Sequence, residues 1–315
     1  MVNNRKKEKE TYEKENNFQV SALKKKLNTA WGIIKELYEY LQSGKGIKFT
    51  LRIFLRIFFE KILKMFYQLL PHKGVKVVEE DWDYLIVLTA CRYDAFKLLN
   101  DLPGKLEKRI SLGSSTLEWL KKNFTDYYDD IVYVSANPRI SDTEFAGFKG
   151  TDHFFKVINV WKGWSRKLNT ILPSEVTKTA LKVVRRFPNK RIIIHYLQPH
   201  APWIGKTTLA GEELGLSFSD PIEWYRNASK IGRRGIWSRA EILGYTLKFL
   251  RKCYIDNLRI VLEEVKKLID KLDGKIVVTS DHGELFGEAF LVEHPTGIYL
   301  RKLVEVPWLI IEKKH

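Results

Sequence analysis

Short apolar runs alternate with longer amphipathic segments from about residue 83 to the C-terminus. The runs are rich in β-branched residues and predict strands at 84–88, 131–135, 191–197, 275–280 and 306–311. The intervening segments predict helices at about 92–99, 115–124, 174–187 and 240–272. Strands that are apolar throughout and separated by helices are typical of a mainly parallel sheet that is covered on both faces. We therefore expect an α/β fold, a three-layer α/β/α sandwich.

Residues 47–70, IKFTLRIFLRIFFEKILKMFYQLL, follow a different pattern. Charged residues recur about every four positions, at Arg52, Arg56, Glu60, Lys61 and Lys64. They interrupt the segment too often for a membrane-spanning helix, but their spacing predicts a basic amphipathic helix with a broad aromatic face. Such a helix could lie on an anionic membrane surface, or it could pack on the globular domain and expose its basic face to water.

Changes in composition divide the chain into regions. Residues 1–18 form a mixed-charge run without a hydrophobic period, which we expect to be disordered. Residues 19–75 form the basic helical region, which ends near Pro71 and Gly74, and residues 76–315 form the α/β domain. Within this domain, residues 204–239 lack a clear period and predict a lid or excursion.

The charge of the chain limits its partners. It contains 54 Lys+Arg against 38 Asp+Glu, a net charge of +16, and about half of the excess lies in residues 1–70. No nucleic-acid reading motif accompanies this charge, so no specific nucleic-acid partner is expected. The N-terminus has no apolar stretch of the kind that a signal peptide needs, so we expect the cytoplasm, including the inner face of the membrane. Cys91 and Cys253 are too far apart for a CxxC motif and are expected to be reduced and buried.

Polar residues follow the predicted strands. They are Thr89 and Arg92, Asn137, His200, and Asp281 with His282. Because the carboxyl ends of parallel strands meet at one edge of a sheet, where ligands bind in such folds, we expect these side chains to converge. Convergence of this kind suits a functional site better than a hydrophobic core.

The segment TSDHGE places a carboxylate next to an imidazole. Carboxylate oxygen and imidazole nitrogen both bind Zn²⁺ or Mn²⁺, so Asp281 and His282 are candidate metal ligands. Gly283 would relieve crowding in the turn that follows. His294, just before a proline, could return a second imidazole to the same edge.

The segment SLGSSTLEWL offers hydroxyl groups at the start of a predicted helix. Ser114, Ser115 or Thr116 could simply cap the helix. The same position also suits a nucleophile, because amide groups and the positive end of the helix dipole can hold an anion nearby. A metal ion bound to the hydroxyl would lower its pKa.

In chain order, CRYDAF, the Ser/Thr-rich helix start, HYLQPHAPW, VTSDHGE and EHPTG resemble the alkaline phosphatase/sulfatase superfamily. The resemblance covers roughly residues 80–312 and is strongest to the sulfatase-like branch with lipoteichoic acid synthases and archaeal members. It implies an α/β/α sandwich in which metal ions activate a Ser, Thr or formylglycine nucleophile against phosphate or sulfate esters.

The resemblance also implies roles for individual residues. Asp281, His282 and His294 would be metal ligands, with His294 alternatively a substrate ligand. Thr116 would be both nucleophile and ligand, with Ser115 as second choice. His200 would contact the transferred group or the leaving oxygen. Arg92 and Asn137 would help to bind the anion.

Two positions depart from the family pattern. Sulfatases proper need Cys or Ser in a C/S-x-P-x-R context, and neither Cys91 nor Cys253 nor any serine has it, so formylglycine-type sulfatase activity is disfavoured. The family also places an acidic metal ligand after the first strand, where this chain has Thr89. A neutral hydroxyl binds a divalent ion less well than a carboxylate.

We therefore expect a metal-dependent hydrolase or transferase of a phosphate ester or diester, for which lipid-linked and glycan-linked esters are candidate substrates. The metal would be Mn²⁺ or Zn²⁺, with Mg²⁺ or Ca²⁺ as further candidates. The alternative is a catalytically degenerate member that acts as a binding or membrane-surface protein, with Thr89 as its mark.

Overall fold

The computed structural model describes residues 46–211, 213–214 and 235–313. The predictions for residues 1–18, for residues 19–45 and for most of the expected lid lie outside these residues. The chain divides into two compact units, Met1–Ile57 and Phe58–His315, and the sheet lies in the second. The following description concerns that second unit.

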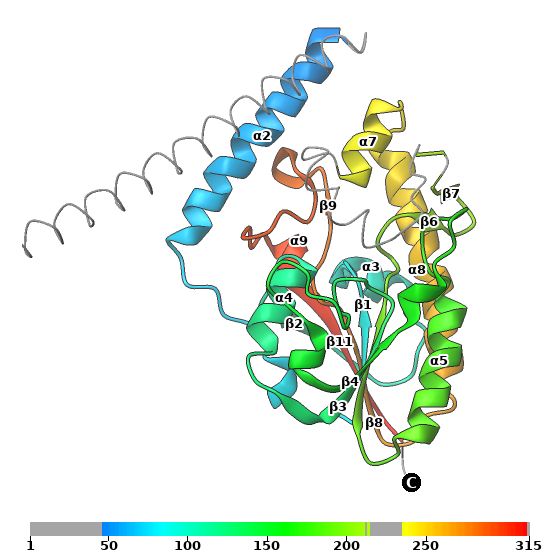
Figure 1. The fold of residues 1–315 in the computed structure, drawn as a ribbon. Coiled ribbons are helices and arrows are strands. Elements are labelled where there is room, and N and C mark those ends of the chain that lie inside the picture. The colour runs from blue at the N-terminus through cyan, green and yellow to red at the C-terminus, as the bar shows by residue number, and fades with distance from the viewer. Residues whose placement is uncertain (1–45, 212, 215–234, 314–315) are drawn as a thin grey trace, which may run out of the picture. The chain divides into compact units, whose positions relative to one another are not determined.

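A seven-stranded sheet forms the centre of the second unit (Figure 1). The strands lie in the order β2 (Lys105–Ile110), β11 (Glu305–Glu312), β8 (Lys275–Thr279), β1 (Tyr84–Leu88), β5 (Arg191–Tyr196), β3 (Tyr128–Ser135) and β4 (Phe154–Asn159). Strand β11 runs antiparallel to β2 and β8, whereas the other neighbouring pairs are parallel. The prediction of a mainly parallel sheet is therefore confirmed.

Two apolar cores lie on opposite faces of this sheet, because successive side chains of a strand point to opposite sides. Ile86 and Leu88 of β1 belong to a core with helices α3 (Tyr93–Leu99), α5 (Pro173–Arg186) and α8 (Leu247–Ile269). Leu85 and Val87 belong to a second core with Trp119 of α4 (Thr116–Asn123). Figure 1 shows α5 and α8 on one side of the sheet and α4 on the other. The fold is thus a three-layer α/β/α sandwich, as the sequence predicts.

The smaller elements connect these layers. They are the 3-10 helices η1 (Val77–Glu79), η2 (Gly150–Asp152), η3 (Val160–Gly163) and η4 (Glu288–Phe290), the short strands β6 (Trp203–Ile204), β7 (Thr208–Leu209), β9 (Leu285–Phe286) and β10 (Val292–Glu293), and helices α7 (Ile236–Ile242) and α9 (Arg301–Val304). The predicted lid contributes β6, β7 and α7 among the described residues.

The five predicted strands are confirmed as β1, β3, β5, β8 and β11, but the edge strands β2 and β4 were not predicted. Strand β2, KLEKRI, is charged and partly exposed, so it lacks the apolar run of a buried strand. The single helix expected at 240–272 is wrong in its first part. The chain turns at Gly244, which has a φ of +97°, and Thr246 then caps α8 by accepting a hydrogen bond from Phe249 N.

Helix α2 (Gly46–Gln68) confirms the helix predicted at 47–70. In the second unit its last turns contact the segment after β9: Phe59 stacks on Phe290 at 5.0 Å between ring centroids, and Tyr67 meets Tyr299 edge to face at 5.6 Å. Within the described part of the chain, no helix combines the length and the apolar character that crossing a membrane requires.

Candidate active site

Three neighbouring strands, β8, β1 and β5, deliver the residues of the candidate site to one edge of the sheet. Asp281 and His282 follow the end of β8, and His195 lies near the end of β5. Thr116 is the first residue of α4. Asp281 and His282, which were expected at this edge of the sheet, therefore lie next to Thr116 of the helix start.

Thr116, His195, Asp281 and His282 form what we call the inner cluster, which is fully buried. Thr116 donates a hydrogen bond from Oγ1 to Asp281 Oδ2 at 2.6 Å, and the same Oγ1 lies 3.3 Å from His282 Nε2. The Nε2 atoms of His282 and His195 lie 3.4 Å and 3.8 Å from Asp281 Oδ2. Side-chain atoms of Thr116, His282 and His195, from three segments of the chain, therefore surround Asp281 Oδ2.

Both imidazoles of the inner cluster are oriented through Nδ1. In His282 this atom lies 2.8 Å from the carbonyl oxygen of Gly283, which can only accept a hydrogen bond. His282 therefore carries its proton on Nδ1 and presents the Nε2 lone pair to Asp281 and Thr116. In His195, Nδ1 lies 2.7 Å from the hydroxyl of Tyr133. The arrangement of His282, with Nδ1 fixed and the Nε2 lone pair available, is usual for a metal-binding histidine. In His195, by contrast, Nε2 contacts the Thr89 hydroxyl at 2.9 Å.

Backbone groups hold the other oxygen of Asp281. Oδ1 accepts hydrogen bonds from Ala90 N at 3.0 Å and from His282 N at 2.9 Å. Ala90 adopts a left-handed φ of +62°, which is unusual for a residue with a Cβ. At Gly283 a Cβ would collide with the carbonyl oxygen of Lys302, so this position requires glycine, as expected. The local backbone is built to position the Asp281 carboxylate.

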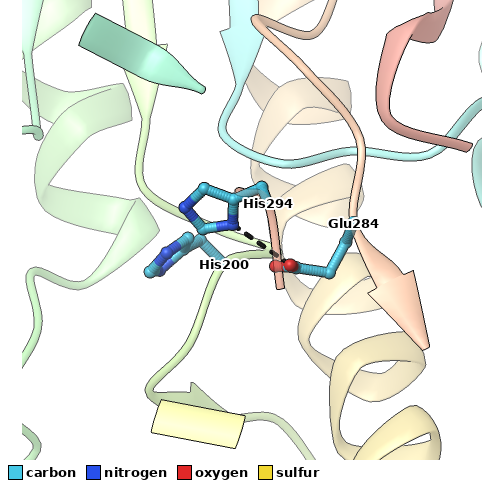
Figure 2. Close-up of side chains that lie close together, drawn as sticks. All are labelled: His200, Glu284 and His294. Atoms are coloured by element: carbon cyan, nitrogen blue, oxygen red, sulfur yellow. Dashed lines mark hydrogen bonds and ion pairs between the residues drawn. The ribbon is translucent and has the colours of Figure 1, made fainter. Parts of the chain in front are cut away.

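His200, Glu284 and His294 form a second group, which we call the outer cluster (Figure 2). Their potential ligand atoms all lie within 4.8 Å of one another, so these residues could also hold a metal ion. His294 Nδ1 lies 3.1 Å from Glu284 Oε1, as the dashed line in Figure 2 shows. His200 Nδ1 lies 2.5 Å from the carbonyl oxygen of Ala201, which leaves Nε2 of His200 as an acceptor.

The two clusters are adjacent. The ring of His294 lies 4.4 Å from the ring of His282 and 5.1 Å from the ring of His200, measured between centroids. His294 and His200 are partly exposed, whereas His282 is fully buried. The outer cluster therefore lies between the inner cluster and solvent-accessible surface, where a substrate can reach it.

Burial sets the protonation of these groups. It lowers the pKa of His195 and His294 to about 4 and that of His200 to about 3, so all three imidazoles are neutral at pH 7. Burial also raises the pKa of Glu284 to about 8, which leaves it protonated. Asp281 differs: burial acts to raise its pKa, but His282, His195 and the hydrogen bond from Thr116 outweigh this effect and lower it.

The other predicted site residues lie around the clusters. Ser115 is the N-cap residue of α4 but makes no side-chain capping bond, and its hydroxyl accepts a hydrogen bond from Thr296 at 2.8 Å. Asn137 is buried, and its side-chain oxygen accepts a bond from Arg139 N. These contacts assign no role to Ser115 or Asn137, so the functions of both residues stay predictions.

The Arg92 side chain is held by carboxylates outside the clusters. It forms ion pairs with Asp94 at 2.7 Å and with Glu288 at 2.8 Å, and its guanidinium lies 4.3 Å from the centroid of the Phe286 ring. The structure does not bring this guanidinium together with the inner cluster. Its predicted part in anion binding stays a prediction.

Thr89 follows β1 directly, and its hydroxyl lies in the interior. It donates to the carbonyl oxygen of Tyr196 at 2.8 Å and lies 2.9 Å from His195 Nε2. Three residues of the site were not singled out from the sequence: His195, Glu284 and Tyr133. His195 had one available signal, a histidine within an otherwise apolar strand, and Glu284 lies only three residues after Asp281.

No family model matches the sequence, and no curated protein matches it. Among solved structures, the chain is similar to integral membrane lipooligosaccharide phosphoethanolamine transferase A from Neisseria meningitidis (14% identity, TM-score 0.49, 91% of this chain and 60% of that chain). It is also similar to the C-terminal periplasmic domain of EcEptC from Escherichia coli in complex with Zn (14% identity, TM-score 0.46, 77% and 75%).

A third similar structure is a protein from Vibrio parahaemolyticus (11% identity, TM-score 0.41, 81% of this chain and 68% of that chain). It is described as a member of the alkaline phosphatase superfamily, which is the superfamily that the sequence motifs of this chain resemble.

Proposed function

We propose that this chain is a metal-dependent hydrolase or transferase that acts on a phosphate ester or diester through Thr116. The observation that supports this most strongly is the position of Thr116 Oγ1. It lies 2.6 Å from Asp281 Oδ2 and 3.3 Å from His282 Nε2, at the N-terminus of a helix. A hydroxyl next to a carboxylate, an imidazole and the positive end of a helix dipole is suited to attack on an anionic ester.

The donors of the inner cluster fit a divalent ion. A carboxylate oxygen, an imidazole nitrogen with its lone pair free and a hydroxyl oxygen suit Zn²⁺ or Mn²⁺ better than Mg²⁺ or Ca²⁺, which prefer oxygen donors alone. Asp281, His282 and Thr116 would hold the ion, and His294 is the next candidate ligand. When bound, such an ion lowers the pKa of a coordinated hydroxyl and neutralises charge on the phosphate.

The chain's own residues can carry the transfer. Thr116 points its proton at Asp281 Oδ2, and loss of that proton leaves an oxygen that attacks phosphorus. A Thr116 Oγ1–P bond then forms as the P–O bond to the leaving group breaks. Neutral His200 keeps its one ring proton on Nδ1, toward the carbonyl oxygen of Ala201, so the leaving oxygen takes its proton from solvent water. Water or an acceptor hydroxyl then attacks phosphorus and loses its proton, the bond from phosphorus to Thr116 Oγ1 breaks, and Thr116 regains a proton beside Asp281 Oδ2.

The outer cluster would hold the oxygens of the group that is transferred. Glu284 and His294 form a neutral hydrogen-bonded pair, so they add no negative charge that would repel a phosphate. His200 lies beside them. This assigns His294 the role of substrate ligand, or of ligand to a further metal ion.

Turnover of a chromogenic phosphodiester by the zinc-loaded protein tests this proposal. We expect Thr116→Ala to reduce turnover by at least about 10³-fold, because among the described residues no other hydroxyl donates to Asp281 Oδ2. Ser115→Ala serves as the matched control on the preceding residue and is expected to keep activity within about threefold. Turnover that is unchanged in both variants would exclude a nucleophile at this helix start.

The degenerate alternative keeps the fold but has no turnover. It is motivated by Thr89, whose hydroxyl is engaged with Tyr196 and His195 rather than free. A parent protein that binds zinc but cleaves none of a panel of phosphate mono- and diesters would favour this alternative. In that case the chain would act by binding.

Helix α2 supports a second proposal, contact with an anionic membrane surface. From Phe58 on, large apolar side chains recur at helical spacing along α2 and in the two residues that follow it, and they stay exposed: Phe58, Ile62, Met65, Phe66, Leu69 and Leu70. Lys61 is exposed between them. An apolar stripe with basic neighbours is the pattern of a helix that lies in a membrane interface. This would bring the site near lipid-linked esters on the inner face of the membrane.

Sedimentation with vesicles that contain anionic lipid tests the membrane proposal. We expect Met65→Glu with Leu69→Glu to reduce the bound fraction at least fivefold, and high salt to weaken binding of the parent. Leu98→Glu is the matched control, because Leu98 is 76% exposed but lies on α3. Equal sedimentation of the parent and the α2 variant at low salt would contradict the proposal.

A further inference from the structure

Glu118 is a largely buried carboxylate that the proposed mechanism does not use. It lies on the first turn of α4, two residues after Thr116, and its side chain is only 11% exposed. Burial acts to raise the pKa of its carboxyl group, but the hydrogen bonds that this group accepts outweigh burial and lower the pKa, so Glu118 is ionised at pH 7. A buried carboxylate costs free energy unless it is paired, so its position requires an explanation.

We propose that Glu118 and Ser114 form a clamp that positions the nucleophile Thr116 relative to His294 of the outer cluster. This inference rests on the function proposed above. Glu118 and Ser114 are positioning residues: they act through the two segments that carry Thr116 and His294, and they take no part in the bonds that form and break.

The carboxylate of Glu118 holds the chain just before the nucleophile. Its Oε2 accepts a hydrogen bond from Ser114 N at 2.9 Å and lies 3.0 Å from Ser114 Oγ. A glutamate on the first helical turn that reaches back to an amide before the helix is a common way to fix a helix start. Ser115, the N-cap residue, makes no side-chain capping bond, so Glu118 is the side chain that fixes the backbone before Thr116.

Ser114 joins this helix start to the segment that follows His294. Its Oγ accepts a hydrogen bond from Gly297 N at 2.9 Å. The single proton of the hydroxyl has two acceptors, Glu118 Oε2 and the carbonyl oxygen of Pro295 at 3.1 Å. Gly297 adopts a φ of +80°, and an added Cβ would meet no atom within 4 Å, so the backbone conformation rather than crowding favours glycine there. This turn brings the residues just after His294 onto Ser114.

Tyr299 connects the same two segments a second time. Its hydroxyl donates a hydrogen bond to Glu118 Oε1. Lys122 Nζ lies 2.8 Å from that carboxylate oxygen and 2.9 Å from the hydroxyl of Tyr299, so the three groups form one hydrogen-bonded network. Residues 295–299 are thus fixed to α4 at both ends, and His294, which directly precedes them, takes its position from these contacts.

The separation of Thr116 and His294 matters for the proposed transfer. Thr116 Oγ1 belongs to the inner cluster, whereas His294 belongs to the outer cluster, which holds the oxygens of the transferred group. A change in their separation moves the attacking oxygen relative to phosphorus, and a misplacement of about 1 Å costs about 10²-fold in rate. Asp281 and His282 follow β8 on a different segment, so loss of the clamp is expected to change kcat more than zinc affinity.

Steady-state kinetics of the zinc-loaded full chain with a chromogenic phosphodiester test the clamp. We expect Glu118→Gln to lower kcat about 30-fold and Ser114→Ala to lower it about 10-fold, with KM and zinc affinity within about threefold of the parent. Glu264→Gln is the matched control, because Glu264 is 14% exposed and pairs with Lys267 on the same helix but lies on α8. This control should keep kcat within about twofold.

Hydrogen exchange gives a readout that does not depend on turnover. Ser114→Ala should raise amide exchange in residues 296–299 at least about fivefold, because Gly297 N loses its acceptor, while exchange in β1 stays unchanged. Unchanged exchange in residues 296–299 would contradict the clamp. Ser114→Ala removes a single oxygen atom, so a folding defect in Glu118→Gln leaves the test intact.

The outcomes separate this inference from the proposed function. If Thr116→Ala abolishes turnover while both clamp variants keep the parental kcat, the proposed function stands and the clamp is overturned. A loss of zinc affinity as large as the loss of kcat would also overturn it, since the variants would then act through the metal. A parent without turnover, or a Thr116→Ala variant with parental turnover, overturns both proposals.

Discussion

The inner and outer clusters contain the same ionisable groups, two imidazoles and one carboxyl group each, but in opposite electrostatic states. In the inner cluster, Asp281 accepts hydrogen bonds from Thr116 and from two backbone N–H groups, and its pKa is lowered. In the outer cluster, Glu284 faces His294, and burial raises its pKa to about 8. Both carboxyl groups are fully buried, so burial alone does not decide which one is charged.

The difference lies in the donors that surround each carboxyl group. Three hydrogen bonds to the ionised form keep Asp281 negative in a buried position, and Ala90 adopts a left-handed backbone conformation next to one of them. The inner cluster is thus prepared for a cation. The neutral His200 and His294 of the outer cluster suit the binding of an anion, or of a substrate group whose charge changes during the reaction.

The largest expected effect comes from removing the charge of the inner cluster. Asp281→Asn eliminates the carboxylate ligand and the acceptor of the Thr116 proton, so we expect phosphoester turnover to fall at least about 10³-fold. Initial rates with saturating zinc measure this. Asp152→Asn, in the 3-10 helix η2, is a control that should remain active. Near-parental activity of Asp281→Asn would show that the negative charge of the inner cluster is not needed for turnover.

An intermediate effect is expected from the outer cluster. His294→Gln removes a ring that lies between His200 and His282, so we expect kcat/KM to fall about 10²-fold. Zinc affinity at the inner cluster should stay within about threefold of the parent. A loss of zinc binding as large as that of Asp281→Asn would show that the two clusters act as one metal centre.

The smallest effect tests the electrostatic contrast itself. Glutamine has nearly the shape of a protonated glutamate and can also donate to His294, so Glu284→Gln should change turnover at pH 7 by less than about fivefold. Asp281→Asn is the matched acid-to-amide exchange. Comparable losses in the two variants would mean that Glu284 acts as a carboxylate.

The fold could be predicted where burial imposes a pattern. Strands β1, β5 and β8 are apolar runs with central positions in the sheet, whereas the edge strands β2 and β4 have one or more open faces and no such run. The helix break at Gly244 was missed because the apolar spacing continues across it.

The site could be predicted where residues follow strands. Asp281 and His282 follow the predicted strand β8, whereas Thr116 was singled out from the helix start and the family resemblance, since the strand before it was not predicted. The contacts of His195 with Tyr133 and Thr89 join strands β5 and β3 and the residue after β1, across more than 100 positions of the sequence, and no local pattern reveals them. The protonation of Glu284 depends on its burial, which only the packed structure provides.

Calorimetric titration of the metal-stripped protein with Zn²⁺ tests the central claim most directly, with Asp281→Asn alongside the parent. If the inner cluster is a metal centre, the parent binds zinc tightly and Asp281→Asn loses that binding while keeping its fold by circular dichroism. The same titration curve for both proteins would show that the inner cluster is not the metal centre.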